Sequence, residues 1–103
     1  MMHFALLGKY DPTTITESFA REREIMGNPP AGVEVIARYA RVGGKGGFIH
    51  IVEADSAEQL GVLLFEFVGL IEYEIVPIVE LTEAKGVELV KEYVSDIPMH
   101  GPL

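Results

Sequence analysis

The chain has 103 residues, 49% of them hydrophobic, and its 16 acidic residues against 8 basic ones give a net charge of −8. This length fits a single domain, residues 1–103, and the chain has no cysteine, which excludes disulfides, zinc–thiolate sites and thiol catalysis. The acidic balance disfavours nucleic acid and anionic membranes as partners. No signal-peptide pattern and no apolar run of membrane-spanning length is present, so we expect a cytoplasmic protein.

The first half of the chain predicts a strand, a helix and a second strand. Residues 1–10 form a short apolar run that is typical of a buried strand. The following helix begins either at Asp11, with Pro12 in its first position, or at Thr14. It ends before the two prolines of residues 27–32. One side of this helix is expected to carry an apolar stripe that a single carboxylate interrupts: Ile15, Phe19, Glu22 and Met26.

The second half predicts two further strands and two helices. Residues 33–42 and 48–54 are rich in β-branched residues and read as strands. A helix capped by Asp55 or Ser56 should then run over residues 57–70 with one buried side, formed by Leu60, Leu64, Phe67 and Val68. Residues 72–81 predict a fourth strand, and a third helix capped by Thr82 should follow it. Residues 95–103 are expected to be a loose C-terminal tail.

The stretch from Val42 to Gly47 contains four glycines around Lys45. A phosphate-binding loop joins a strand to a helix, whereas these glycines join two strands. They therefore predict a hairpin whose tip needs positive φ at several residues. The alternative is a mobile flap over a pocket, with Lys45 attracting an acidic ligand.

The order β-α-β-β-α-β-α predicts an α+β protein of the ferredoxin-like βαββαβ type with an extra C-terminal helix. Its four-stranded antiparallel sheet would carry both main helices on one face. The fourth strand, which contains Pro77, should lie at an edge, where proline is tolerated. Both faces of the sheet look apolar. On the face away from the helices we expect six apolar side chains: Phe4, Leu6, Ile49, Ile51, Val76 and Ile78. An apolar surface of this size predicts a homodimer formed through that face, or a higher oligomer.

The segments "MHFALLGKYDP", "GGFIHIVEADSAEQL" and "EYEIVPIVEL" resemble the dimeric α/β-barrel superfamily, and within it an uncharacterised family of small prokaryotic proteins. The resemblance implies a barrel made by two sheets packed face to face. It also implies a small organic ligand in a cleft between sheet and helices, and it allows isomerase or monooxygenase-like activity. The alternative is a non-catalytic dimerisation or assembly module without a ligand pocket, because fold does not fix function.

Two histidines stand in otherwise apolar strands, and they are the first candidates for substrate binding. The first and third strands should be antiparallel neighbours. If Ala54 faces the helix that follows it, His50, two pleats back on the same strand, should face the helices too. By resemblance to the superfamily, His3 faces the same way. An imidazole suits acid–base chemistry near neutral pH, but both residues can equally be core histidines with satisfied nitrogens.

Tyr39 is the third candidate, because strand alternation places it with Val33 and Val35 on the helix side. Arg38 and Glu53 would then lie on the opposite face as a charged pair between subunits, and Glu22 would lie at the border of the buried stripe. No spacing of ligands indicates a metal site, and no motif indicates a cofactor, so none is expected.

Overall fold

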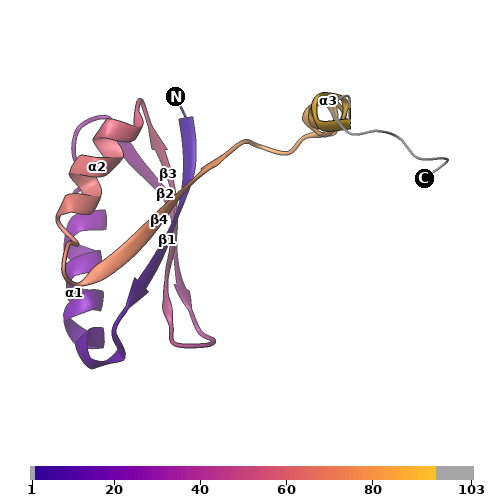
Figure 1. The fold of residues 1–103 in the computed structure, drawn as a ribbon. Helices are drawn as coiled ribbons and strands as arrows, with labels where there is room; N and C mark the ends of the chain where they lie inside the picture. The colour runs from indigo at the N-terminus through magenta and orange to yellow at the C-terminus, as the bar shows by residue number, and fades with distance from the viewer. Residues whose placement is uncertain (1, 95–103) are drawn as a thin grey trace.

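The computed structural model describes residues 2–94, which form four strands and three α-helices (Figure 1). In chain order these elements are β1 (Met2–Tyr10), a 3-10 turn (Pro12–Thr14), α1 (Ile15–Met26), β2 (Val33–Arg41), β3 (Gly47–Ala54), α2 (Ala57–Phe65), β4 (Ile71–Ile78) and α3 (Glu83–Val94). The predicted order of elements is confirmed. The predicted tail over 95–103 lies outside the described residues.

The strands form one antiparallel sheet in the order β2-β3-β1-β4, which is the ferredoxin-like arrangement expected from the sequence. Helices α1 and α2 cover one face of this sheet, and no described helix lies flat on the other (Figure 1). The edge position of β4 is also confirmed. Pro77, which cannot donate a backbone hydrogen bond, therefore sits where one side of the strand has no neighbour.

Side-chain caps explain where the helices begin. The Asp11 carboxylate accepts a hydrogen bond from the Thr13 backbone N–H at 2.9 Å and caps the 3-10 turn, whose first residue is Pro12. Ser56 Oγ accepts from the Gln59 N–H at 3.4 Å at the start of α2. Thr82 Oγ1 accepts from the Lys85 N–H at 3.1 Å at the start of α3. The predicted caps at Ser56 and Thr82 are therefore present. Asp11 caps the 3-10 turn that precedes α1, whereas Thr14, the N-cap residue of α1, makes no side-chain cap hydrogen bond.

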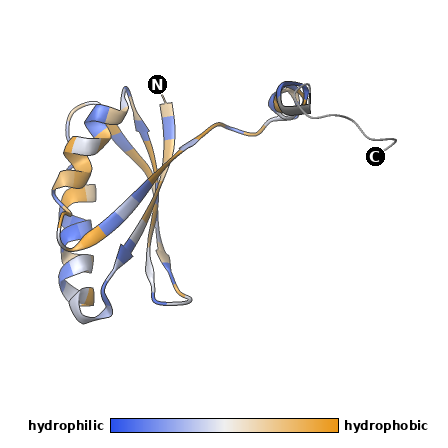
Figure 2. Cartoon of the chain, viewed as in Figure 1, coloured by the Kyte–Doolittle hydropathy of each residue, from blue (hydrophilic) through white to orange (hydrophobic). Residues whose placement is uncertain are grey.

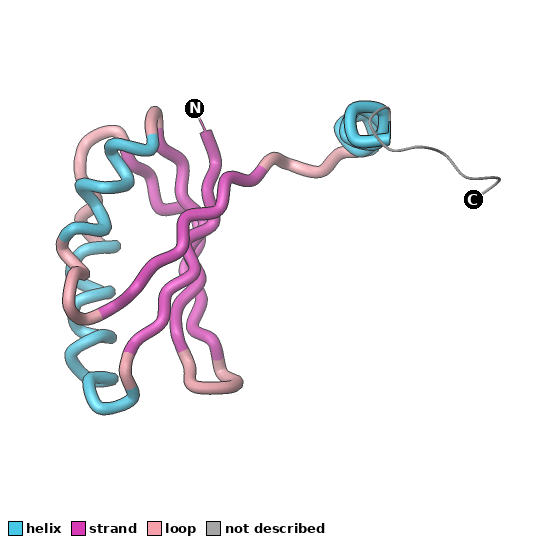
Figure 3. The backbone as a smooth tube through the Cα atoms, in the orientation of Figure 1, coloured by secondary structure: helices cyan, strands magenta, loops and turns pink. Residues whose placement is uncertain are grey.

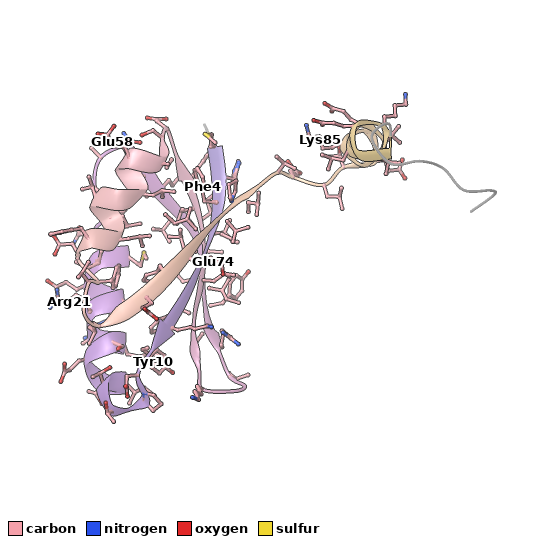
Figure 4. The ribbon with its side chains drawn as sticks, viewed as in Figure 1. Phe4, Tyr10, Arg21, Glu58, Glu74 and Lys85 are labelled. Atoms are coloured by element: carbon pink, nitrogen blue, oxygen red, sulfur yellow. The ribbon has the colours of Figure 1, made fainter. Side chains whose placement is uncertain are left out.

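The core lies between the sheet and the two helices, and Figure 4 labels Phe4 among its side chains. It is made of apolar residues from the sheet, from α1, and from α2 and the turns after it: Phe4, Leu6, Met26, Val33, Phe48, Val52, Ala54, Leu60, Leu63, Phe67 and Ile71. Figure 2 shows that α2 is apolar over most of its length. This helix ends at Phe65, earlier than predicted, because a series of turns follows it and Gly69 adopts a φ of +84°. Val68 is consequently exposed and not buried as expected.

The sequence assigned the two faces of β1 the wrong way round. Cα pairing sets Leu6 opposite His50 and His3 opposite Glu53, and directly opposed residues of antiparallel strands share a face. Phe4 and Leu6 therefore face the helices and not the free face. We call the sheet face away from α1 and α2 the open face. Apolar residues occupy its middle: Ala5, Leu7, Ala37, Ile49, Ile51 and Val76, with Tyr39 and Ile78 beside them.

The hairpin between β2 and β3 is confirmed. Gly46 N–H donates to the Gly43 carbonyl at 3.2 Å, and Gly44, Gly46 and Gly47 all have positive φ, at 63°, 82° and 145°. These are backbone conformations that residues with a Cβ rarely adopt. The glycines therefore serve a tight hairpin, as the strand–strand context predicted.

Helix α3 stands away from the rest of the chain. An extended connector, residues 79–82, leads from β4 to α3 on the side of the open face (Figures 1 and 3). Val79 and Leu81 in the connector and Val87 and Val90 on the helix are all exposed. A helix of this length gains most of its stability from packing, so α3 presents an apolar side without a partner within residues 2–94.

Candidate functional site: a buried charged cluster beneath the first helix

The most polar part of the interior is a cluster of three ionisable side chains, Glu22, Arg38 and His50. Glu22 lies on the inner side of α1, while Arg38 on β2 and His50 on β3 are paired opposite each other in the sheet. Arg38 Nε donates to Glu22 Oε2 at 2.8 Å, and Arg38 Nη2 donates to Oε1. His50 Nε2 lies 2.8 Å from Glu22 Oε2. The carboxylate thus joins the helix to both strands.

The electrostatics of the cluster keep Glu22 ionised and His50 neutral. Burial raises the pKa of Glu22, but hydrogen bonds from Arg38 and His50 outweigh burial and hold it below its usual value. Burial lowers the pKa of His50 by more than the Glu22 carboxylate raises it. An ionised carboxylate only accepts hydrogen bonds. His50 Nε2 therefore carries the imidazole proton and donates a hydrogen bond to Glu22 Oε2.

Two buried polar atoms beside this network have no hydrogen-bond partner among the described residues: His50 Nδ1 and the Tyr73 hydroxyl. The two rings are neighbours, with centroids 5.8 Å apart. Burial, followed by the Glu22 charge, raises the pKa of Tyr73 far above its usual value, so its hydroxyl keeps its proton. A neutral His50 therefore has an unused acceptor, and Tyr73 has an unused donor.

The cluster reaches the surface at a hollow of about 360 Å³ between α1 and β2. Thr16, Phe19, Ala20 and Arg23 line it together with Glu22 and Arg38. The Arg38 side chain is 46% exposed, whereas that of Glu22 is 6% exposed and that of His50 is 0% exposed. Arg38 is therefore the member of the network that a ligand in the hollow can touch directly.

The structure places only one of the three sequence-predicted site residues in this cluster. His50 faces the helices, as predicted. His3 lies on the open face, where its Nε2 is 3.9 Å from Glu53 Oε1. Tyr39 is paired with Ile49 on the same open face and is 59% exposed. The prediction that His3 and Tyr39 face the helices beside His50 is therefore wrong.

A β-bulge in β2 explains the misplacement of Tyr39 and Arg38. The pairing with β3 shifts between Val35 and Ala37, so that Ile36 is an extra residue. Every side chain after the bulge changes face. Arg38 consequently turns toward α1 and Tyr39 toward the open face, and the predicted intersubunit pair of Arg38 with Glu53 is wrong.

The sequence analysis missed Glu22, Arg38 and Tyr73 as members of the site. The signal for Glu22 was present in the sequence. A single carboxylate within the apolar stripe of a helix, together with a histidine expected to face that helix, indicates a buried carboxylate–histidine pair. No pattern marked the bulge that brings Arg38 to Glu22. Within the described part of the chain, no group of three or more His, Asp or Glu side chains is arranged to hold a metal ion. No helix in residues 2–94 is long and apolar enough to cross a membrane.

The strand order and the sequence comparison classify this protein. It is an α+β protein of the ferredoxin-like type with a four-stranded antiparallel sheet. The family model described as "Domain of unknown function (DUF3303)" matches residues 2–93, and the chain belongs to this family. A search of curated proteins gives no match.

Proposed function

We propose that this protein binds a small organic acid in the hollow between α1 and β2, with Arg38 as the group that recognises the acid. The observation that carries the proposal is the Glu22–Arg38–His50 network, in which Glu22 and His50 are buried and Arg38 is half exposed. Burying an ion pair is seldom the most stable way to fill a core, because the charges lose their hydration. Perturbed ionisable groups beside a cavity are therefore candidates for function.

The geometry of Arg38 supports a ligand with a carboxylate. A guanidinium has five N–H donors, and Glu22 accepts hydrogen bonds from two of its nitrogens. Its remaining donors are available at the hollow, and the Glu22 contacts fix the plane of the group, which favours bidentate recognition. Phe19, 43% exposed, adds an apolar surface to the same hollow. A small acid with an apolar or aromatic body matches this combination.

An acid–base enzyme, such as the isomerase that the superfamily resemblance allows, would use His50 Nδ1 as its base. That atom is buried, and His50 lies behind Glu22 as seen from the hollow. Proton transfer to a substrate would therefore require α1 to move away from the sheet. Binding is the activity that the present arrangement supports directly.

The experiment is a thermal-shift screen of aromatic and aliphatic carboxylic acids, followed by calorimetry with the acids that raise the melting temperature. Arg38→Met should weaken binding at least tenfold, because it removes the donors and keeps an unbranched apolar side chain. Arg21→Met is the matched control, since Arg21 lies on α1, one of the two elements beside the hollow, and donates to the Glu66 carbonyl outside it. Equal affinities in the two folded variants contradict the proposal.

A second candidate function is homodimerisation through the open face, and the apolar residues of that face favour it. Ala5, Leu7, Ile49, Ile51 and Val76 adjoin one another across three strands. Exposed apolar patches of this kind usually mark interaction surfaces, and a second copy of the same face is the simplest partner. Helix α3 stands on the same side of the sheet (Figure 1), where a second copy could also cover its apolar residues.

Light scattering at low micromolar concentration tests this second candidate. The wild type should be a dimer, and Ile51→Glu should be a monomer or fail to fold, because the change places a charge in the interface. Val62→Glu is the control, since Val62 is 60% exposed on α2. It should leave the dimer intact. A well-folded wild-type monomer would remove this candidate.

A further inference from the structure

Basic residues gather at one end of the sheet, although the chain as a whole is strongly acidic. Lys9 stands near the end of β1, Arg41 at the end of β2, and Lys45 in the hairpin that follows. They are three of only eight basic residues in a chain with a net charge of −8. None of the three forms an ion pair with any residue that the structure describes. Free cations grouped in this way create a local positive potential.

These cations surround a cavity. Lys9, Arg41 and Lys45 line a hollow of about 260 Å³ together with Tyr10 and Gly46. A second hollow of about 530 Å³ shares Lys9, Tyr10 and Lys45 with the first, so the two adjoin each other. Pro12, Leu70 and Ile71 add apolar surface to this larger hollow, and Asp11 and Glu72 also line it. A cationic compartment therefore opens into a larger compartment that contains two carboxylates.

The glycines of the hairpin allow this arrangement. A Cβ on Gly46 would lie 2.2 Å from the Tyr10 hydroxyl, and a Cβ on Gly47 would lie 2.3 Å from the Gly8 carbonyl oxygen. Only glycine permits such close approach of the hairpin to β1, and Lys45 and Lys9 line the same two hollows. Tyr10 is held in turn by edge contacts with Phe19 and Phe48, at centroid distances of 5.9 and 5.4 Å. Figure 4 shows Tyr10 at the end of β1 next to the start of α1.

We infer that this end of the sheet is a second binding site, which takes a small organic molecule with a single anionic group. The carboxylate or phosphate of the ligand lies in the smaller hollow between Lys9, Arg41 and Lys45. The Tyr10 hydroxyl supplies an additional polar contact at that position. The uncharged body of the ligand lies in the larger hollow against Pro12, Leu70 and Ile71.

The two carboxylates of the larger hollow restrict the ligand further. The pKa of Asp11 is held below its usual value by hydrogen bonds from Thr13 and by the charge of Lys45, so Asp11 is ionised. Glu72 is paired with Lys9 across β1 and β4, at the border between the two compartments. A second anionic group on the ligand would meet both carboxylates. Hydroxyl or amine groups on the ligand body would instead donate hydrogen bonds to these carboxylates.

The test is a titration of ¹⁵N-labelled full-length protein with inorganic phosphate, phenyl phosphate and benzoate, each at the same ionic strength. Inorganic phosphate should saturably shift the amides of Tyr10, Gly44 and Gly46. Phenyl phosphate should bind at least fivefold more tightly than inorganic phosphate and should also shift Leu70 and Ile71. The affinities of benzoate and phenyl phosphate, read at the same three amides, show whether the site prefers a carboxylate or a phosphate head group. Absence of saturable shifts with all three probes overturns the inference.

Variants separate this site from the Arg38 hollow and from general charge effects. Lys45→Met, in a hairpin loop, should weaken phenyl phosphate binding at least fivefold. Lys91→Met removes the same charge from α3 and should leave the affinity unchanged. The affinity is read from the amides of Tyr10, Gly44 and Gly46 and not from Arg38, so that failure of this site and failure of the proposed function give different results. Equal weakening by Lys45→Met and Lys91→Met shows non-specific attraction and contradicts the site.

Discussion

Replacing Glu22 by glutamine tests whether the buried network holds α1 to the sheet. The Glu22 carboxylate accepts hydrogen bonds from two nitrogens of Arg38 and one of His50. Removing one partner of a buried ion pair costs about 3–5 kcal/mol. Because Arg38 is 46% exposed, water compensates part of its loss, and the glutamine oxygen still accepts one bond. We therefore expect Glu22→Gln to reduce the free energy of unfolding by about 2–3 kcal/mol.

Urea denaturation at pH 7 and a fixed protein concentration measures this change. Glu24→Gln is the matched control, because Glu24 is exposed on the same helix, and it should change stability by less than about 0.5 kcal/mol. The double variant Glu22→Gln/Arg38→Met should lose less stability than the sum of the two single variants, since it leaves no unpaired cation. A loss below about 0.5 kcal/mol for Glu22→Gln would refute the reasoning.

Three further predictions concern single residues. The pKa of His50 is lowered in the folded state. Its contribution to stability is therefore present above the unfolded pKa of about 6.5 and declines as pH falls below that value. Urea melts at pH 7 and 5.5 should show a smaller loss of unfolding free energy on acidification for His50→Asn than for His3→Asn. Tyr73→Phe removes a buried hydroxyl that has no hydrogen-bond partner among residues 2–94. It should leave stability unchanged or raise it by up to about 1 kcal/mol, and a loss larger than that in urea melts would mean that the hydroxyl is bonded. Gly47→Ala should cost about 1–3 kcal/mol, because φ is 145° and the Cβ would meet the Gly8 carbonyl oxygen. A Cβ on Gly43 would have no described atom within 4 Å beyond its own chain neighbours, so Gly43→Ala should be tolerated; urea melts of the two variants measure the difference.

The order and type of the elements could be predicted because local signals agree with the fold. Ser56 and Thr82 cap helices where the sequence indicated, Asp11 caps the turn that leads into α1, and Pro77 marked the edge strand. The hairpin glycines were also interpretable, since their context was strand to strand. These features depend on the nearest few residues, which is why they are legible in one sequence.

The candidate site was less predictable because it depends on which way each strand faces. Strand β1 is apolar on both sides, so its pattern does not tell whether Leu6 or His3 lies beside the helices, and only the pairing of Leu6 with His50 decides it. The bulge at Ile36 has no distinct sequence signature, yet it exchanges the positions of Arg38 and Tyr39. The polar network at Glu22 followed from these two long-range facts, and helix periodicity alone could not supply it.

The central claim, that the Glu22–Arg38–His50 network supports a small-molecule site at Arg38, is tested most directly by observing the Arg38 Nε–H resonance by NMR. Its hydrogen bond to Glu22 should make this proton visible and slow to exchange at neutral pH. Adding an acid that raises the melting temperature should shift the Arg38 Nε–H and the Phe19 ring saturably, with the same dissociation constant as calorimetry gives. If the acids bind while both resonances stay unchanged, the hollow between α1 and β2 is not the binding site and the account is wrong.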